Sequence, residues 1–115
     1  MIQQPHGPLQ GIKVIEVGQL IAGPFTGSLL GYFGAEVIKI EPPGSGDPLR
    51  KWRMMDGDTS VWWASMGRNK KCITVNLRVK EGQQIVRKLA ANADVLIENF
   101  RPGTMEKWGL GPETL

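Results

Sequence analysis

One segment, Ile12–Glu41, constrains the fold of this chain more than any other. Largely apolar runs over residues 13–17 and 36–40 flank a glycine-bearing loop and a stretch in which apolar side chains recur at helical spacing. Pro24 suits the first position of that helix, and Gly34 suits its C-terminal cap. The apolar side chains of the helix are Phe25, Leu29, Leu30 and Phe33. A strand, a loop, a helix and a second strand begin a parallel α/β sheet, which binds ligands where strand ends meet helix N-termini.

The rest of the chain continues the alternation of strands and helices. After a long loop over residues 42–58, we expect a short helix over 59–66, a strand over 71–76, a helix over 80–91, a strand over 94–98 and a short helix over 102–108. Long loops in compact domains are often functional. The predicted inner face of the helix over 80–91 consists of Ile85, Val86, Leu89 and Ala90. These elements predict an α/β fold, a Rossmann-like three-layer domain with a mainly parallel sheet.

Composition limits the classes of protein and of site. The chain has 115 residues, enough for one domain, and its 41% hydrophobic and 22% charged residues are typical of a soluble globular protein. The formal net charge of +3 is mild, so it does not predict a nucleic-acid partner, but it suits a surface that binds an anion. Cys72 is the only cysteine, so no internal disulfide can form, and its apolar strand predicts a buried, inert thiol. With one cysteine and one histidine, His6, the sequence predicts no metal site.

The N-terminus and the hydropathy of the chain predict no membrane association. Residues 1–10 lack the basic and apolar regions of a signal peptide, and they resemble a loose N-terminal arm. No apolar stretch approaches the roughly 20 residues that span a bilayer. We therefore expect a cytoplasmic protein.

Three polar motifs lie in predicted turns. Gly18–Gly23 has the spacing G-x4-G rather than G-x-G-x-x-G, so a dinucleotide site, in which Glu41 would bind the ribose, competes with a plain chain turn. Glu98–Gly103 lies at the exit of the last predicted strand, where it can face a ligand or only open a helix at Pro102. Basic residues in the turns can form an anion site or a solvated surface; they are Arg50, Lys51, Arg53, Arg68, Lys70 and Lys71.

Four sequence blocks together resemble one enzyme family. They are LQGIKVIEVGQLIAGPF, LGYFGAEVIKIEPPGSGDPLR, GRNKKCITVNL and ADVLIENFRPGTMEKWGLGPETL, and they cover nearly the whole chain in order, from about Gly7 to Leu115. The chain resembles the N-terminal segment of the family III CoA-transferases, which include formyl-CoA transferase, carnitine CoA-transferase and the α-methylacyl-CoA racemases. This resemblance implies that coenzyme A, as an acyl-CoA, is the substrate and that no metal is needed.

The resemblance also implies which residues contact CoA. The matching positions in this chain are Ile21, Ala22, Val75, Asn76, Leu77, Arg78, Asn99, Phe100, Arg101 and Lys107. Of these, Lys107 matches a basic residue that meets a CoA phosphate. Formyl-CoA transferase has glutamine where this chain has Ile21, so we expect a substrate other than oxalate, such as the dicarboxylate succinate. Pro42 stands where the family often has an arginine that contacts the CoA nucleotide.

The implied activity of the parent protein is transfer of CoA between an acyl-CoA donor and a small carboxylic acid acceptor. The family's nucleophilic aspartate lies downstream of these blocks, so we expect no catalytic residue before Leu115 and an inactive 115-residue chain. Residues 11–115 would then be a truncated N-terminal part of a CoA-binding domain, from a larger fold in which two chains interlock as a homodimer. An acyl-CoA racemase or epimerase of the same family and a non-catalytic CoA-binding fragment are the alternatives.

Overall fold

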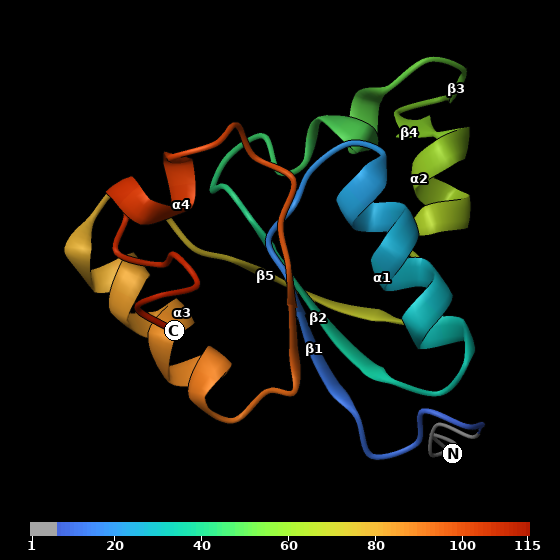
Figure 1. Cartoon of the computed structure of the whole chain (residues 1–115). Coiled ribbons are helices and arrows are strands. Elements are labelled where there is room, and N and C mark those ends of the chain that lie inside the picture. The colour runs from blue at the N-terminus through green and yellow to red at the C-terminus, as the bar shows by residue number, and fades with distance from the viewer. Residues whose placement is uncertain (1–6) are drawn as a thin grey trace.

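The computed structural model describes residues 7–115, and its main feature is a four-stranded parallel sheet (Figure 1). The strands are β1 (Lys13–Glu16), β2 (Glu36–Glu41), β5 (Lys70–Thr74) and β6 (Val95–Ile97), in the order β5-β2-β1-β6. Every neighbouring pair in this sheet is parallel. His6 and most of the predicted N-terminal arm lie outside the described residues.

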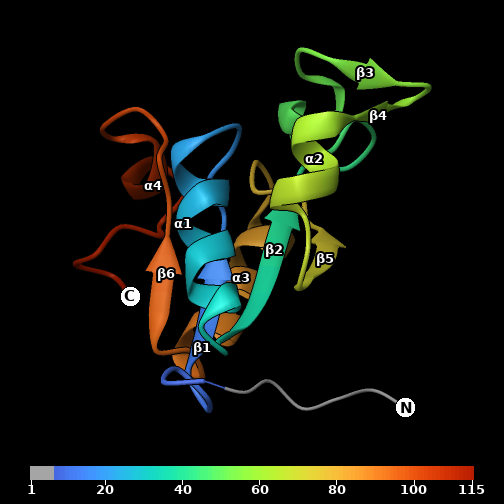
Figure 2. The same cartoon turned by 90° about the vertical axis from the view of Figure 1, so that its right-hand side faces the viewer.

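Two crossover helices place the sheet between helical layers. Helix α1 (Ala22–Tyr32) joins β1 to β2, and α3 (Lys80–Ala91) joins β5 to β6. Figure 1 shows α1 and α3 on opposite faces of the sheet, with the short α4 (Thr104–Lys107) beside α3. The predicted three-layer α/β fold with a parallel sheet is confirmed. The chain runs from β1 to one edge and returns to the other side of β1 (Figure 2), and such reversals of strand order are where ligands bind.

The segment between β2 and β5 holds more structure than the predicted long loop. It contains the 3₁₀ helix η1 (Pro48–Lys51) and the antiparallel pair β3 (Met55–Asp56) and β4 (Thr59–Ser60), and the predicted short helix follows as α2 (Val61–Met66). Gly57, with a φ of 62°, turns the chain directly after β3, and an Asp-Gly pair is a common hairpin signal. Strands of two residues are too short to show the alternation of apolar and polar residues. The Asp56-Gly57 pair is therefore the signal that could have predicted the hairpin.

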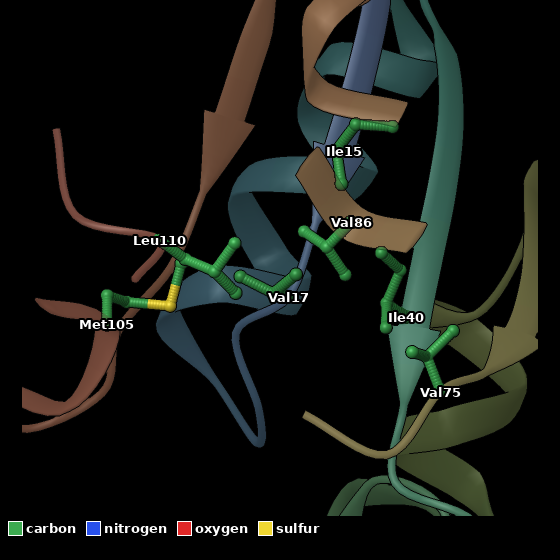
Figure 3. Packing of buried hydrophobic residues seen from close by; sticks show 7 residues of the cluster. All are labelled: Ile15, Val17, Ile40, Val75, Val86, Met105 and Leu110. Carbon is green, nitrogen blue, oxygen red and sulfur yellow. The ribbon is translucent and has the colours of Figure 1, made fainter. Parts of the chain in front are cut away.

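Two hydrophobic clusters hold the helices to the sheet. The larger one lies between the sheet and the helices α3 and α4 (Figure 3) and consists of Ile15, Val17, Ile40, Val75, Val86, Met105 and Leu110. The smaller one consists of Val14, Ala35 and Val37. Helix α3 has its predicted bounds, but Val86 is fully buried whereas Ile85 is 47% exposed, so the predicted inner face is wrong at Ile85. Consecutive residues of a helix point about 100° apart, which turns Ile85 away from the core.

Helix α1 turns mainly its small residues toward the sheet. The buried residues of this helix are Gly23, Pro24 and Gly27. About half of each large side chain is exposed at Phe25, Leu29 and Phe33. A Cβ atom added at Gly27 would collide with the carboxylate of Glu16, which lies beneath the helix. The predicted apolar stripe therefore exists, but of its four side chains only Leu30 packs toward the sheet, against the smaller cluster.

Cys72 is exposed, which corrects the prediction of a buried thiol. It lies on β5, an edge strand of the described sheet on which most residues are exposed. The apolar alternation of this segment could not show that the strand has an uncovered edge position. Desolvation and the charge of Glu41 raise the pKa of the Cys72 thiol, which disfavours the nucleophilic thiolate.

Candidate functional site

A cavity of about 470 Å³ opens at the carboxyl edge of the sheet, the edge at which the sequence predicts a ligand. Strand ends and the segments that follow all four strands of the main sheet line it. Its lining residues are Val17, Gln19, Ile40, Glu41, Pro42, Ser45, Gly46, Pro48, Asn76, Leu77, Arg78, Phe100, Thr104 and Trp108. Phe100 and Trp108 meet edge to face, with ring centroids 5.3 Å apart, and form an apolar wall. The size and the mixed lining are typical of a small-ligand site.

Four of the ten residues predicted to contact CoA line this cavity. They are Asn76, Leu77, Arg78 and Phe100. Val75 is buried in the larger hydrophobic cluster, and Ile21 and Ala22 lie exposed at the start of α1. Arg101 and Lys107 are also exposed and do not line the cavity. The contact of CoA with these residues stays a prediction.

Asn99, another predicted residue, ties the end of β6 to the loop after β1. Its Nδ2 donates to the backbone oxygen of Gln19 at 2.9 Å, and its Oδ1 accepts from the backbone N–H of Gln19 at 2.8 Å. A side chain at Gly18 would collide with Asn99, and a Cβ at Gly23 would lie 2.9 Å from the Cα of Gly18. The G-x4-G spacing thus lets the loop pack against itself and against Asn99, a role that neither alternative from the sequence included.

Charged side chains form a buried network between the sheet and α1. Lys39 Nζ lies 2.6 Å from Glu16 Oε2 and 2.6 Å from Asp47 Oδ2. Lys70 Nζ lies 2.7 Å from Glu16 Oε1 and donates to the backbone oxygen of Pro24 at 2.7 Å. The four charged side chains are at most 1% exposed. Burial alone would lower the pKa of Lys39, but the two carboxylates raise it overall, whereas burial lowers the pKa of Lys70 despite Glu16.

Sequence patterns alone do not reveal this network, because charged residues in a strand ordinarily predict a solvent-facing side. The parallel register places Glu16 beside Lys39, so opposite charges at matching positions of adjacent strands are the signal that could have found it. Most of the cavity residues from β2 and the loop after it also had no predicted role. The path of that loop is set by the contacts of its side chains, which no local pattern specifies.

Glu41, at the end of β2, is engaged with protein groups. Its Oε1 accepts from Arg50 Nε at 2.6 Å and from the backbone N–H of Asp47 at 2.9 Å, and its Oε2 accepts from Arg50 Nη2 at 2.7 Å. The Arg50 guanidinium also stacks on Trp63, 3.9 Å from the ring centroid. With three donors already bound, Glu41 is poorly suited to hold a ribose, which disfavours the dinucleotide hypothesis. Arg50 is likewise paired and less available for an external anion.

The pair of Glu41 and Arg50 predicts a loss of stability in acid. Burial alone would raise the pKa of Glu41, but the bonds from Arg50 and from the Asp47 N–H hold it below its ordinary value of 4.5. A carboxyl with a lowered pKa stabilises the folded state above its ordinary pKa, and this contribution is lost as the pH falls through the folded-state value. We expect urea denaturation to show a free energy of unfolding that falls between neutral pH and about pH 3. In the Glu41→Gln variant this dependence on pH should be weaker. A profile as steep in Glu41→Gln as in the exposed control Glu113→Gln would contradict this expectation.

Comparison with known proteins identifies the family. The family model described as CoA-transferase family III matches residues 9–115. This chain belongs to CoA-transferase family III. Succinyl-CoA--D-citramalate CoA-transferase of Chloroflexus aurantiacus is 54% identical over 114 residues, which cover 98% of this chain and 28% of that protein. Succinyl-CoA:glutarate CoA-transferase of Homo sapiens is 44% identical over 109 residues, which cover 94% of this chain and 25% of that protein.

Solved structures agree with this assignment to family III. A CaiB/BaiF family protein from Brucella suis superposes with a TM-score of 0.85 at 39% identity, over 95% of this chain and 30% of that one. A hypothetical protein from Mycobacterium tuberculosis gives a TM-score of 0.86 at 42% identity, over 96% of this chain and 30% of that one. The family III chain thus spans less than a third of the length of these relatives.

Two absences concern the part of the chain that the structure describes. Between residues 7 and 115, no helix is both long and apolar enough to cross a bilayer. In the same described range, no three side chains of His, Cys, Asp or Glu gather as a metal ion would require.

Proposed function

We propose that the protein containing this chain is a CoA-transferase that moves CoA from an acyl-CoA donor to a small carboxylic acid, with succinyl-CoA as the donor. The observation that carries the proposal is the cavity at the carboxyl edge, lined by Arg78 and Phe100 in a chain of this family. Relatives named as succinyl-CoA transferases, at 54% and 44% identity, support the donor. Ile21, in place of the glutamine of formyl-CoA transferase, supports an acceptor other than oxalate.

The residues of this chain suit the nucleotide half of CoA. Arg78 lies exposed at the cavity and carries a permanent charge for a phosphate group. The side chain of Asn76 accepts from the backbone N–H of Arg78 at 3.0 Å, which orders the turn after β5. Leu77, Phe100 and Trp108 offer apolar surface to an adenine ring. We infer that the nucleotide half lies here and that the thioester arm runs toward Ile21 and Ala22 at the start of α1.

We infer that the nucleophilic aspartate of the reaction lies outside this segment. Asp47 is 1% exposed, and its carboxylate is paired with Lys39. Asp94 accepts from the backbone N–H of Lys13 at 2.9 Å, at the amino edge of the sheet and far from the cavity. Asp56 and Asp58 belong to the exposed hairpin of β3 and β4. In this proposal the chain contributes binding, and the covalent chemistry belongs to other residues of the parent protein.

Arg78→Ala is expected to weaken CoA binding about tenfold or more, because a charge-assisted hydrogen bond contributes roughly 1.5–3 kcal/mol. Calorimetric titration of CoA and of dephospho-CoA into the parent protein measures the loss and the share of the 3′-phosphate. Lys107→Ala, outside the cavity lining, tests the second predicted phosphate contact, and the exposed Lys88→Ala is the matched control. If the Arg78→Ala variant bound CoA with wild-type affinity, Arg78 would not contact a CoA phosphate.

Two assays on the same parent protein distinguish transferase activity from racemase activity. Incubation of succinyl-CoA with candidate carboxylic acids, followed by mass spectrometry, detects newly formed acyl-CoA. Deuterium uptake at C2 of a 2-methylacyl-CoA detects racemisation or epimerisation instead. We expect transfer, and deuterium uptake without transfer would replace the proposed function by the racemase alternative.

A further inference from the structure

Two loops of the candidate CoA site meet at one buried side chain. The segment after β1, residues 18–24, runs from a loop into the first turn of α1 and brings Gln19 to the cavity wall. The segment after β2, residues 42–50, runs from a loop into η1 and contributes four lining residues. Asp47 belongs to the second loop but does not line the cavity, and it is only 1% exposed. Any effect of Asp47 on a ligand must therefore pass through the two loops.

The carboxylate of Asp47 bonds to both loops and to the strand beneath them. Its Oδ1 accepts from the backbone N–H of Leu20 at 2.9 Å and from that of Leu49 at 2.8 Å. Its Oδ2 lies 2.6 Å from Lys39 Nζ. Lys39 Nζ in turn donates to the backbone oxygen of Gly18 at 3.3 Å. One ion pair thus holds two backbone groups of the loop after β1.

The held loop includes a strained residue. Leu20 has a φ of 68°, in a left-handed region that residues other than glycine rarely occupy. Such conformations persist only where the surroundings hold them. Here Asp47 bonds the N–H of Leu20, and Asn99 bonds both backbone groups of Gln19. These bonds hold Gln19, which lines the cavity, and its neighbour Leu20.

The second loop is held by the same part of β2. Glu41 receives the backbone N–H of Asp47 and the guanidinium of Arg50, so it closes residues 42–50 back onto the strand. Gly46 has a φ of 71°, and a Cβ there would lie 2.9 Å from Glu41 Oε1. The loop therefore packs directly against this carboxylate. The backbone of Asp47 is thus held by Glu41, while its side chain bonds the N–H of Leu20.

Packing alone does not explain these buried charges. Replacement of a buried ion pair by apolar groups is often neutral or stabilising. Beyond one another, Lys39, Asp47 and Lys70 bond backbone groups of the loop after β1 and of the first turn of α1, namely Gly18 O, Leu20 N and Pro24 O. We propose that Asp47, paired with Lys39, is a positioning residue that preorganises residues 18–24 for CoA binding. This inference rests on the proposed function, and preorganisation strengthens binding because less ordering is left for the ligand to impose.

The test compares two double variants that differ only in the side chain at position 47, and so in whether the N–H groups of Leu20 and Leu49 keep an acceptor. Lys39→Met/Asp47→Asn removes the charge pair but keeps an acceptor for the Leu20 N–H, whereas Lys39→Met/Asp47→Ala removes both. The parent protein is studied by hydrogen exchange with mass spectrometry on peptides covering residues 18–24 and 80–91, and by titration with CoA. In the alanine variant we expect exchange over 18–24 about tenfold faster, and CoA binding about tenfold weaker, than in the asparagine variant. Exchange over residues 80–91 should be the same in both.

The outcomes judge the positioning role separately from the proposed function. Equal exchange and equal affinity in the two variants would overturn the role of Asp47, and so would faster exchange spread over both peptides. If Lys39→Met prevents folding, Asp47→Asn and Asp47→Ala are compared in the same way. A wild-type protein that fails to bind CoA would overturn the proposed function, while the exchange over residues 18–24 would still decide whether Asp47 holds the loop.

Discussion

Replacing Lys39 with methionine is expected to lower the free energy of unfolding by about 3–5 kcal/mol, the cost of removing one partner from a buried ion pair. The ammonium group of Lys39 lies 2.6 Å from a carboxylate oxygen of Glu16 and from one of Asp47. Methionine has a similar volume, so the loss would come from the uncompensated charge of Asp47 and not from a void. Urea denaturation followed by circular dichroism measures it.

Two comparisons isolate the charge effect at Lys39. Lys88→Met alters an exposed lysine of α3 and should change the stability by less than about 0.5 kcal/mol. Adding Asp47→Asn to Lys39→Met should restore part of the lost stability, because the two charges then leave together. If Lys39→Met were as stable as the wild type, the network would contribute nothing to folding.

Gly82→Ala is expected to cost about 3 kcal/mol, although alanine is the better helix former by about 1 kcal/mol. Gly82 is buried in the first turn of α3, where a Cβ would collide with the backbone oxygen of Asn76. A backbone oxygen cannot rotate aside as a side chain can, so α3 would have to move away from the turn after β5. Since that turn carries Leu77 and Arg78 on the cavity wall, CoA binding should weaken as well.

Thermal and urea unfolding of Gly82→Ala measure this cost, with Gln84→Ala on the exposed side of α3 as the matched control. The control should stay within about 0.5 kcal/mol of the wild type. A Gly82→Ala protein more stable than the wild type would mean that α3 and the turn after β5 separate without penalty.

The two long helices show what the sequence could and could not predict. The bounds of α3 match residues 80–91, because its polar and apolar positions alternate clearly at helical spacing. In α1 the apolar pattern was present, but apart from Leu30 its side chains pointed away from the sheet. The carboxylate of Glu16 lies beneath this helix, so small residues such as Gly27 must face the sheet. A one-dimensional pattern cannot show that a strand beneath a helix carries a buried charge.

The edge that holds the candidate site was predictable, but its internal construction was not. Strand ends and the family blocks located Asn76, Leu77, Arg78 and Phe100, which line the cavity. The bonds that shape the cavity involve loop backbone instead. Asp47 bonds Glu41 six positions away and Leu20 27 positions away, through a loop with no periodic pattern. Cys72 was misplaced for a related reason, since burial on a strand depends on neighbours that the strand itself does not specify.

The buried charges of β1 and β2 also make the sheet intolerant of misalignment. Glu16 and Lys39 are partners in the parallel register. If β2 slipped by one residue, Lys39 would turn to the opposite face, among the apolar side chains of Ile15 and Val86. If two apolar residues replaced the ion pair, the mispaired sheet would bury no charge, and its free-energy cost would be much smaller. We therefore expect the ion pair to disfavour mispaired strands during folding, whatever it adds to the stability of the finished sheet.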